Sequence, residues 1–156
     1  MTNRINYMKA APGGYKAFAA VHLYVQQSGL DPELIDLVYL RVSLINGCAF
    51  CIDMHTRDLL KRGLAAEKLA LLPVWREGGD FFSGRERAAL TWAESVTRVA
   101  DTGIPDADYA VVAEEFDDKQ LADLTYAIGL INAFNRLGVA FRSTPTAVAE
   151  ARAAQR

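Results

Sequence analysis

The amino-acid sequence predicts an all-α protein, a bundle of six to seven helices in a single domain. Apolar residues recur with helical spacing in most segments, and few segments alternate strictly between apolar and polar residues. Start and stop signals divide the chain into successive helices with short connections, which is typical of an all-α bundle. The 156 residues contain no internal repeat or low-complexity linker, so we expect one domain over residues 1–156.

The N-terminal half is expected to hold four helices. They cover Tyr15 to Gln27, Pro32 to about Asn46, a cysteine-containing segment that ends at Gly63, and a short helix around Ala66 to Leu72. Gly29 stops the first helix, because glycine readily takes the left-handed conformation that follows a helix end. Asp31 is the N-cap of the second, and Pro32 suits its first turn. Residues 73–83 are expected to form a loop.

Two longer helices and a shorter one are expected in the C-terminal half. They run from Ser83 to near Asp101, from after Pro105 to about Phe116, and from about Asp118 to Phe141. Ser83 and Glu86 form a capping-box pattern at the start of the first. The segment from Ser143 to Pro145 breaks the last helix, and the Ala-rich tail is expected to add a peripheral turn or two.

The helix over residues 118–141 is apolar on more than one face. Its apolar residues are Leu121, Leu124, Ile128, Ile131, Phe134 and Leu137. A helix that is apolar nearly all round must be buried by something. We therefore expect a central core helix, one of whose faces can also pack against a second subunit.

Composition and charge exclude several classes of protein. Hydrophobic residues make up 51% and charged residues 23% of the chain, which is typical of a globular protein. The net charge of -2 gives no electrostatic reason to expect a nucleic acid or an anionic membrane as partner. The sequence shows no signal-peptide h-region and no apolar run long enough to span a membrane. We therefore expect a cytoplasmic protein, in which two nearby cysteines indicate catalysis, redox sensing or metal binding.

The candidate site lies in the cysteine-containing helix. At 100° per residue, Cys48, Cys51 and His55 share one stripe, which we expect to face inward into a mostly dry, partly accessible pocket. Asp53 and Arg57 lie on the opposite side, where we expect solvent or a subunit contact. The sequence therefore predicts two thiols beside an imidazole on one helix face.

This spacing favours reversible oxidation. Residues i and i+3 of a helix have Cα atoms about 5 Å apart, within the range that a disulfide tolerates. A disulfide that closes so short a loop adds little stability, so a structural purpose is poorly served. The helix N-terminus and His55 both favour a thiolate, whereas burial opposes it. These observations make Cys51 the candidate nucleophile, Cys48 the resolving thiol and His55 the base.

Two other interpretations of the cysteine pair remain open. A Cys2His2 zinc site would need His22 as fourth ligand, with Cys48, Cys51 and His55 on one rigid helix instead of the usual loop. The pair could also be two buried small residues with a packing role only. His22 itself is expected to be a partly buried histidine with its hydrogen bonds satisfied, with a role in the pocket as the alternative.

The motifs resemble those of the AhpD-like alkylhydroperoxidase family, which is grouped with the carboxymuconolactone decarboxylases. The resemblance covers about residues 30–142, and its most specific part is the CxxCxxxH core. The matching segments are Leu40-Arg41-Val42-Ser43, INGCAFCIDMHTRDLLKRG, ERAALTWAESVT and LTYAIGLINAFNRLGVAF. The resemblance implies an all-helical fold, a homo-oligomer (often a trimer or hexamer) and thiol-dependent reduction of hydrogen peroxide or organic hydroperoxides. It implies an external dithiol reductant and no bound cofactor or metal.

The resemblance also implies roles for individual residues. Cys51 would attack the peroxide, Cys48 would resolve the product as a disulfide, and His55 would work in a proton relay with an upstream glutamate. Asp36 stands at that glutamate's position and is one methylene shorter, and Glu33 on the same helix face is the alternative. The best-known relay also has a histidine between the cysteines, where this chain has Phe50.

Two other functions are kept beside the peroxidase. One is a redox-sensing or interaction protein that uses the same disulfide as a switch with poor turnover. The other is a lyase like the carboxymuconolactone decarboxylases, which lack the cysteine pair. Asn132, Asn135 and Arg136 match the family's C-terminal helix, and we expect them to form hydrogen bonds between helices or subunits in preference to contacting substrate.

Overall fold

The computed structural model describes residues 3–155 as ten α-helices and two short 3₁₀ helices, without a strand in that range. The helices are α1 (Tyr7–Ala10), α2 (Pro12–Gln26), α3 (Pro32–Asn46), α4 (Ala49–Lys61), α5 (Ala66–Leu71), η1 (Leu72–Glu77), η2 (Gly79–Phe81), α6 (Gly84–Thr97), α7 (Val99–Thr102), α8 (Asp106–Ala113), α9 (Asp118–Ala140) and α10 (Thr146–Ala154). The all-α prediction is confirmed. Of the predicted domain, residues 1, 2 and 156 lie outside the described part.

The predicted caps set the helix boundaries near the site. The Asp31 carboxylate accepts a hydrogen bond from the Glu33 backbone N–H at 2.9 Å, which starts α3. The helix ends where Gly47 takes a φ of 68°, a conformation open to glycine without strain. α6 begins with the predicted capping box of Ser83 and Glu86.

Some boundaries differ from those predicted. The first long helix begins at Pro12 instead of Tyr15, because proline suits the first turn, and the short helix α1 precedes it. The segment expected as a loop over residues 73–83 contains η1 and η2. The helix expected to end near Asp101 ends at Thr97, and α7 follows a break at Arg98. The unpredicted short helices α1 and α7, and α10 in place of the expected turn or two, explain why ten are found where six to seven were expected.

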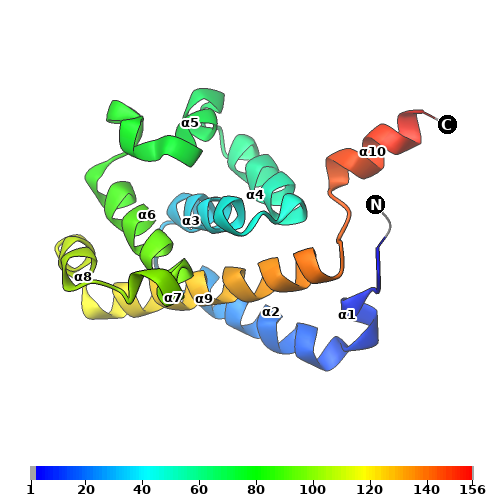
Figure 1. The fold of residues 1–156 in the computed structure, drawn as a ribbon, viewed down its shortest axis with the longest axis horizontal. Helices are drawn as coiled ribbons and strands as arrows, with labels where there is room; N and C mark the ends of the chain where they lie inside the picture. Colours follow the sequence, from blue (N-terminus) through cyan, green and yellow to red (C-terminus); the bar gives the residue numbers. More distant parts are fainter. Residues whose placement is uncertain (1–2, 156) are drawn as a thin grey trace.

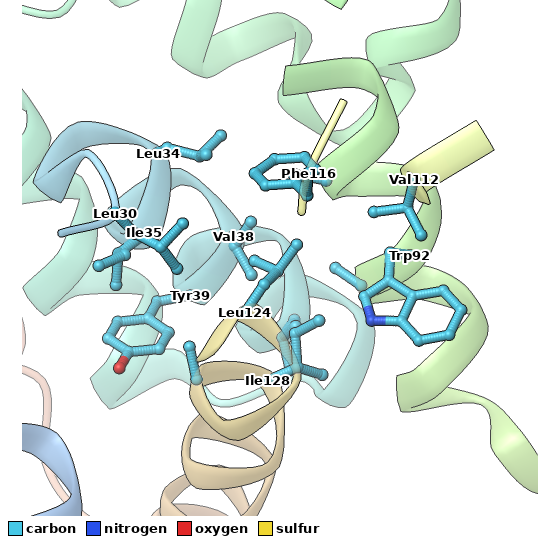
Figure 2. Packing of buried hydrophobic residues seen from close by; sticks show 14 of the residues in the cluster. Leu30, Leu34, Ile35, Val38, Tyr39, Trp92, Val112, Phe116, Leu124 and Ile128 are labelled. Carbon is cyan, nitrogen blue, oxygen red and sulfur yellow. The ribbon is translucent and has the colours of Figure 1, made fainter. Parts of the chain in front are cut away.

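α3 lies in the middle of the molecule, between α4 on one side and α9 on the other (Figure 1). It contributes to both apolar clusters. The larger cluster joins α3 to α2, α6, α8 and α9 and includes Val38, Trp92 and Leu124 (Figure 2). The smaller one places Leu37 of α3 against Leu59 of α4. A helix buried on both sides holds its residues in fixed positions, so α3 and α4 form a rigid support for the candidate site.

α9 is the predicted core helix, but one of its faces is open. Leu124 and Ile128 are fully buried in the larger cluster. On another face, Tyr126 is 59% exposed. This face forms the floor of an open groove of about 750 Å³, whose walls include Val21 of α2 and Tyr109 of α8.

The side of α4 opposite the cysteines, expected to face solvent or another subunit, contacts α10 of the same chain, and the Arg57 side chain stays 38% exposed. The Asp53 carboxylate accepts a hydrogen bond from the Ala147 N–H at 3.1 Å, at the start of α10. Arg57 pairs with Asp53 at 3.0 Å and with Glu150 of α10 at 2.7 Å. The sequence pattern identified these residues as polar but could not show that the C-terminal tail folds back onto them.

Within residues 3–155, none of the helices combines the length and the hydropathy that a membrane crossing requires.

Candidate active site

Cys48 and Cys51 form a disulfide at the N-terminus of α4. Cys48 is the N-cap, and its Sγ accepts a hydrogen bond from the Cys51 backbone N–H at 3.3 Å. The two Cα atoms lie 5.4 Å apart, close to the spacing expected for residues i and i+3. Both side chains are buried, with 1% and 2% exposure. The helix therefore holds both sulfurs in its first turn, where unpaired backbone N–H groups favour negative charge.

α9 approaches the disulfide closely at Gly138. A Cβ atom at this position would lie 2.9 Å from the Sγ of Cys48 and 3.7 Å from the Sγ of Cys51. Only glycine allows this approach without a shift of the sulfur or of the helix. Gly138 is not among the site residues expected from the sequence, although an isolated glycine inside a long helix is a signal of close packing.

His55 lies on the same stripe of α4 as Cys51, as predicted, and is 5% exposed. Its Nδ1 is 3.5 Å from Oδ1 of Asp36, which is near enough for an ion pair when the imidazole is protonated but too long for a good hydrogen bond. Both ring nitrogens are buried and have no hydrogen-bond partner among residues 3–155. No side chain or backbone group of residues 3–155 therefore occupies either nitrogen of the ring.

Of the two candidate carboxylates, Asp36 is the one that the structure places beside His55. Its other oxygen, Oδ2, lies 3.2 Å from Nε of Arg62, at the C-terminal end of α4. Glu33 lies one turn earlier on α3, and its backbone N–H donates a hydrogen bond to the capping carboxylate of Asp31. Asp36 thus connects the imidazole to a guanidinium group, and no ion pair in residues 3–155 links Glu33 to His55.

A cavity of about 250 Å³ opens onto Cys51 and His55. Its lining comes from α1, α2, α3, α4 and α9 and comprises Tyr7, Met8, Tyr15, Ala19, His22, Tyr39, Phe50, Cys51, Met54, His55, Leu130, Ile131 and Phe134. Cys48 is not part of this lining. The predicted partly accessible pocket is therefore present with a mostly apolar lining, and of the two cysteines it is Cys51 that lines it.

His22 and Phe50 both line this cavity. His22 is half-buried on α2, and its ring centroid lies 6.3 Å from that of Tyr39. Burial, followed by the repulsion of a charged His55, lowers the pKa of His22, which favours its neutral form. Phe50 also borders a second, more open cavity of about 550 Å³ between the start of α4 and the end of α9. Phe50, one of the two residues between the cysteines, thus borders both cavities.

A zinc site finds no support among the described residues. The two sulfurs are joined to each other, and residues 3–155 contain no group of three or more His, Cys, Asp or Glu side chains arranged to hold a metal ion.

Behind the site, polar side chains join α3 to α9 and α6. Asn46 donates from Nδ2 to Oδ1 of both Asn132 and Asn135, each at 3.0 Å. Asn132 in turn donates to Oγ1 of Thr97 at 3.0 Å, and the fully buried Asn135 donates to Oγ of Ser43 at 3.0 Å. These contacts are the inter-helix hydrogen bonds expected of Asn132 and Asn135, whereas Arg136 binds Asn132 within its own helix.

The all-helical fold with a CxxC disulfide and a neighbouring histidine is that of the AhpD-like proteins. Residues 12–95, more than half of the chain, match the carboxymuconolactone decarboxylase family. The chain belongs to this family, as an AhpD-like member.

Three proteins illustrate the relationship. YdfG of Bacillus subtilis, an uncharacterized protein, is 39% identical over 90% of this chain and 95% of its own length. The crystal structure of ATU0492 from Agrobacterium tumefaciens, a protein of unknown function suggested to be the antioxidant defence protein AhpD, superposes with a TM-score of 0.89. It is 44% identical and covers 92% of this chain and 98% of its own. The alkyl hydroperoxide reductase AhpD of Koribacter versatilis is 44% identical over 46 residues, 30% of this chain and 24% of that protein.

Proposed function

We propose that the protein is a thiol-dependent peroxidase that reduces hydrogen peroxide or organic hydroperoxides through a Cys48–Cys51 disulfide cycle. The observation that carries the proposal is the position of Cys51, which faces an apolar cavity beside His55 while Cys48 lies behind it. The similarity of a short segment to an alkyl hydroperoxide reductase supports the same chemistry.

In the first step, His55 takes the proton of the reduced Cys51 thiol, and the thiolate attacks the terminal oxygen of the peroxide. An S–O bond forms and the O–O bond breaks, so that Cys51 becomes a sulfenic acid. The departing alkoxide or hydroxide takes the proton from His55 and leaves as alcohol or water. Asp36, 3.5 Å from the imidazole, stabilises its protonated form.

In the second step, the Cys48 thiol attacks the sulfenic acid, the disulfide forms and water leaves. Little movement of the backbone is needed, because the Cα atoms are already 5.4 Å apart at the start of a formed helix. An external dithiol then reduces the disulfide by thiol–disulfide exchange and is itself oxidised to a disulfide. The cycle requires no bound cofactor or metal.

Turnover by the purified protein tests the proposal. Reduced protein should consume tert-butyl hydroperoxide catalytically with dithiothreitol as the donor. Cys48→Ser should react once and leave a sulfenic acid on Cys51 that dimedone traps, whereas Cys51→Ser should lose the fast reaction. A wild-type protein that does not react with peroxide would refute the proposal, and single variants that behave alike would refute the assigned roles.

A redox switch is the second candidate, because the same disulfide could report peroxide without efficient turnover. Such a protein would also be oxidised once per chain and would give the same trapped sulfenic acid. It would differ in the steady state, where a panel of dithiol donors would fail to sustain peroxide consumption.

A further inference from the structure

The hydroxyl group of Tyr39 is a buried polar atom without a partner. The residue is 2% exposed, and its Oη has no hydrogen-bond partner among residues 3–155. Figure 2 shows the hydroxyl pointing away from the apolar residues around Leu30 and Ile35. Buried hydroxyls in native proteins are nearly always hydrogen-bonded, to protein, ordered water or a bound molecule, so the partner of this one must come from outside the described residues.

Tyr39 lines the cavity that also exposes Cys51 and His55. Its ring packs against the imidazole of His55, with the ring centroids 5.1 Å apart. The other tyrosines of the lining, Tyr7 and Tyr15, are half-buried and exposed, respectively. Tyr39 is therefore the deeply buried hydroxyl of this wall, next to the proposed base.

The Tyr39 hydroxyl remains a donor at any pH at which the protein would work. Burial, followed by the nearby Asp36 carboxylate, raises the pKa of Tyr39 well above its ordinary value of 10.0. A neutral phenol in a mostly apolar cavity donates a strong hydrogen bond to an oxygen that gains negative charge, because the low local dielectric strengthens the interaction.

We propose that Tyr39 binds the peroxide and donates a hydrogen bond to the oxygen that leaves when Cys51 attacks. The proposal rests on the peroxidase function above and assigns a third polar group to that reaction. The proton of Tyr39 stays on its own oxygen throughout. The S–O bond forms and the O–O bond breaks as before, and the leaving alkoxide, stabilised by Tyr39, receives its proton from His55.

Tyr39→Phe tests the assignment, because it removes one oxygen and keeps the ring. In the reduced protein, the rate constant for oxidation of Cys51 by tert-butyl hydroperoxide should fall by ~10²-fold, the effect typical of losing one donor to a developing oxyanion. Alkylation of Cys51 by iodoacetamide has no oxyanion leaving group, so its rate and its pH dependence should not change. Ser95→Ala removes another buried hydroxyl that has no partner among residues 3–155 but lies outside this cavity, so it should change neither rate.

The choice of oxidant gives a second test. Peracetic acid releases acetate, which needs little stabilisation, so the loss caused by Tyr39→Phe should be much smaller than with tert-butyl hydroperoxide. The melting temperature of Tyr39→Phe should be unchanged or higher, because an unpaired buried hydroxyl is removed.

Each contrary result has one meaning. Equal losses in oxidation and alkylation would mean that the substitution disturbs the thiolate, and would overturn the proposal. The proposal would also be overturned if Tyr39→Phe lost the same factor with both oxidants. It would be overturned as well if Tyr39→Phe were oxidised as fast as a rapidly reacting wild type. A wild type that does not react with peroxide would instead refute the peroxidase function itself, and the role of Tyr39 with it.

Discussion

Three side chains of the site differ in how firmly the protein holds them. Cys51 is held by the disulfide and by the first turn of α4. Asp36 is held between Arg62 and His55. His55 is placed by the helix and by Tyr39, yet neither of its ring nitrogens makes a hydrogen bond within residues 3–155. In the proposed cycle, this imidazole accepts the proton of Cys51 and gives it to the leaving oxygen, and no hydrogen bond within residues 3–155 competes for either nitrogen.

The relay gives a ranked prediction at the residue scale. Removal of the imidazole in His55→Ala should slow the reaction of Cys51 with peroxide near neutral pH by ~10²–10⁴-fold, the effect of a positioned acid or base. It should also move the midpoint of Cys51 alkylation to higher pH. Asp36→Asn should give a smaller loss of the same kind, because it removes the charge that favours the imidazolium.

Glu33→Gln is the matched control, since it makes the same kind of change one turn away on α3. Its oxidation rate in stopped-flow experiments and its alkylation rate should stay close to those of the wild type across the pH range. If Glu33→Gln proved slower than Asp36→Asn, the relay carboxylate would have been assigned to the wrong residue. Unchanged kinetics in His55→Ala would mean that the helix N-terminus alone activates the thiol.

At the scale of elements, the site depends on how closely α9 packs against α4. The contact is made at Gly138, opposite the disulfide, and is supported by the asparagine side chains that join α3 to α9. α2 reaches the same helix through a buried carboxylate. Asp123 of α9 accepts hydrogen bonds from Tyr24 of α2 at 2.7 Å and from Lys119 at 2.6 Å.

Gly138→Ala should disturb the site, although alanine is the better helix former. The added methyl would meet the Sγ of Cys48 at 2.9 Å, so α9 or the disulfide must move. We expect a lower melting temperature of the oxidised protein and slower formation of the disulfide after peroxide treatment. Gly14→Ala is the control: nothing lies within 4 Å of its added Cβ. It should be neutral or stabilise the fold by up to ~1 kcal/mol. Equal effects of the two substitutions would contradict the close-packing explanation.

Asp123 should make the link between α2 and α9 sensitive to acid. Burial alone would raise the pKa of Asp123, but the hydrogen bonds from Lys119 and Tyr24 outweigh it and hold the pKa below its ordinary value. A carboxylate whose pKa is lower in the folded state stabilises the fold at pH values above its unfolded-state pKa of about 3.9. This stabilisation is lost as the pH falls through the folded-state pKa.

Urea unfolding at neutral and acid pH measures this contribution. Asp123→Asn should lower the free energy of unfolding by about 1–2 kcal/mol at pH 7. This is the range for hydrogen bonds to a charged group when one of the partners, here Lys119, is largely exposed. Near pH 3 the difference from the wild type should shrink. The exposed Asp101→Asn should change the free energy of unfolding by less than about 0.5 kcal/mol at both values. A loss for Asp123→Asn that is independent of pH would show that the charge is not responsible.

At the scale of the whole molecule, one face remains apolar and open. The groove between α2 and α8 over α9 measures about 750 Å³, and three of the side chains around it, Val21, Tyr109 and Tyr126, are 37%, 49% and 59% exposed. We propose that a second copy of the chain covers this face, in line with the expected homo-oligomer. The proposal follows from α9, because the described fold of one chain leaves some of its apolar residues exposed, Tyr126 among them.

Light scattering after size exclusion should therefore give a multiple of the chain mass, with a trimer or hexamer expected. Tyr126→Glu should shift the protein toward the single chain, because an unpaired charge is unfavourable in an apolar interface. Val99→Glu introduces the same charge at an exposed residue of α7, outside the groove lining, and should leave the mass unchanged. A wild type that runs as a single chain, or a Tyr126→Glu variant with the wild-type mass, would refute this surface.

The sequence by itself determined the helical class, most helix boundaries and the shared stripe of Cys51 and His55. These features depend on local spacing, caps and glycine or proline signals, as at Asp31 and Gly63. The boundaries it missed, such as the break at Arg98, have no strong local signal.

Only the tertiary structure decided which residues from distant segments meet around α4 and its disulfide. It placed Asp36 instead of Glu33 at His55, brought Gly138 against Cys48, folded α10 onto Asp53, and left the Tyr39 hydroxyl without a partner among residues 3–155. The physical reason is that each of these contacts depends on how two helices cross. Packing of whole apolar faces sets that crossing, and a single helix pattern does not contain it.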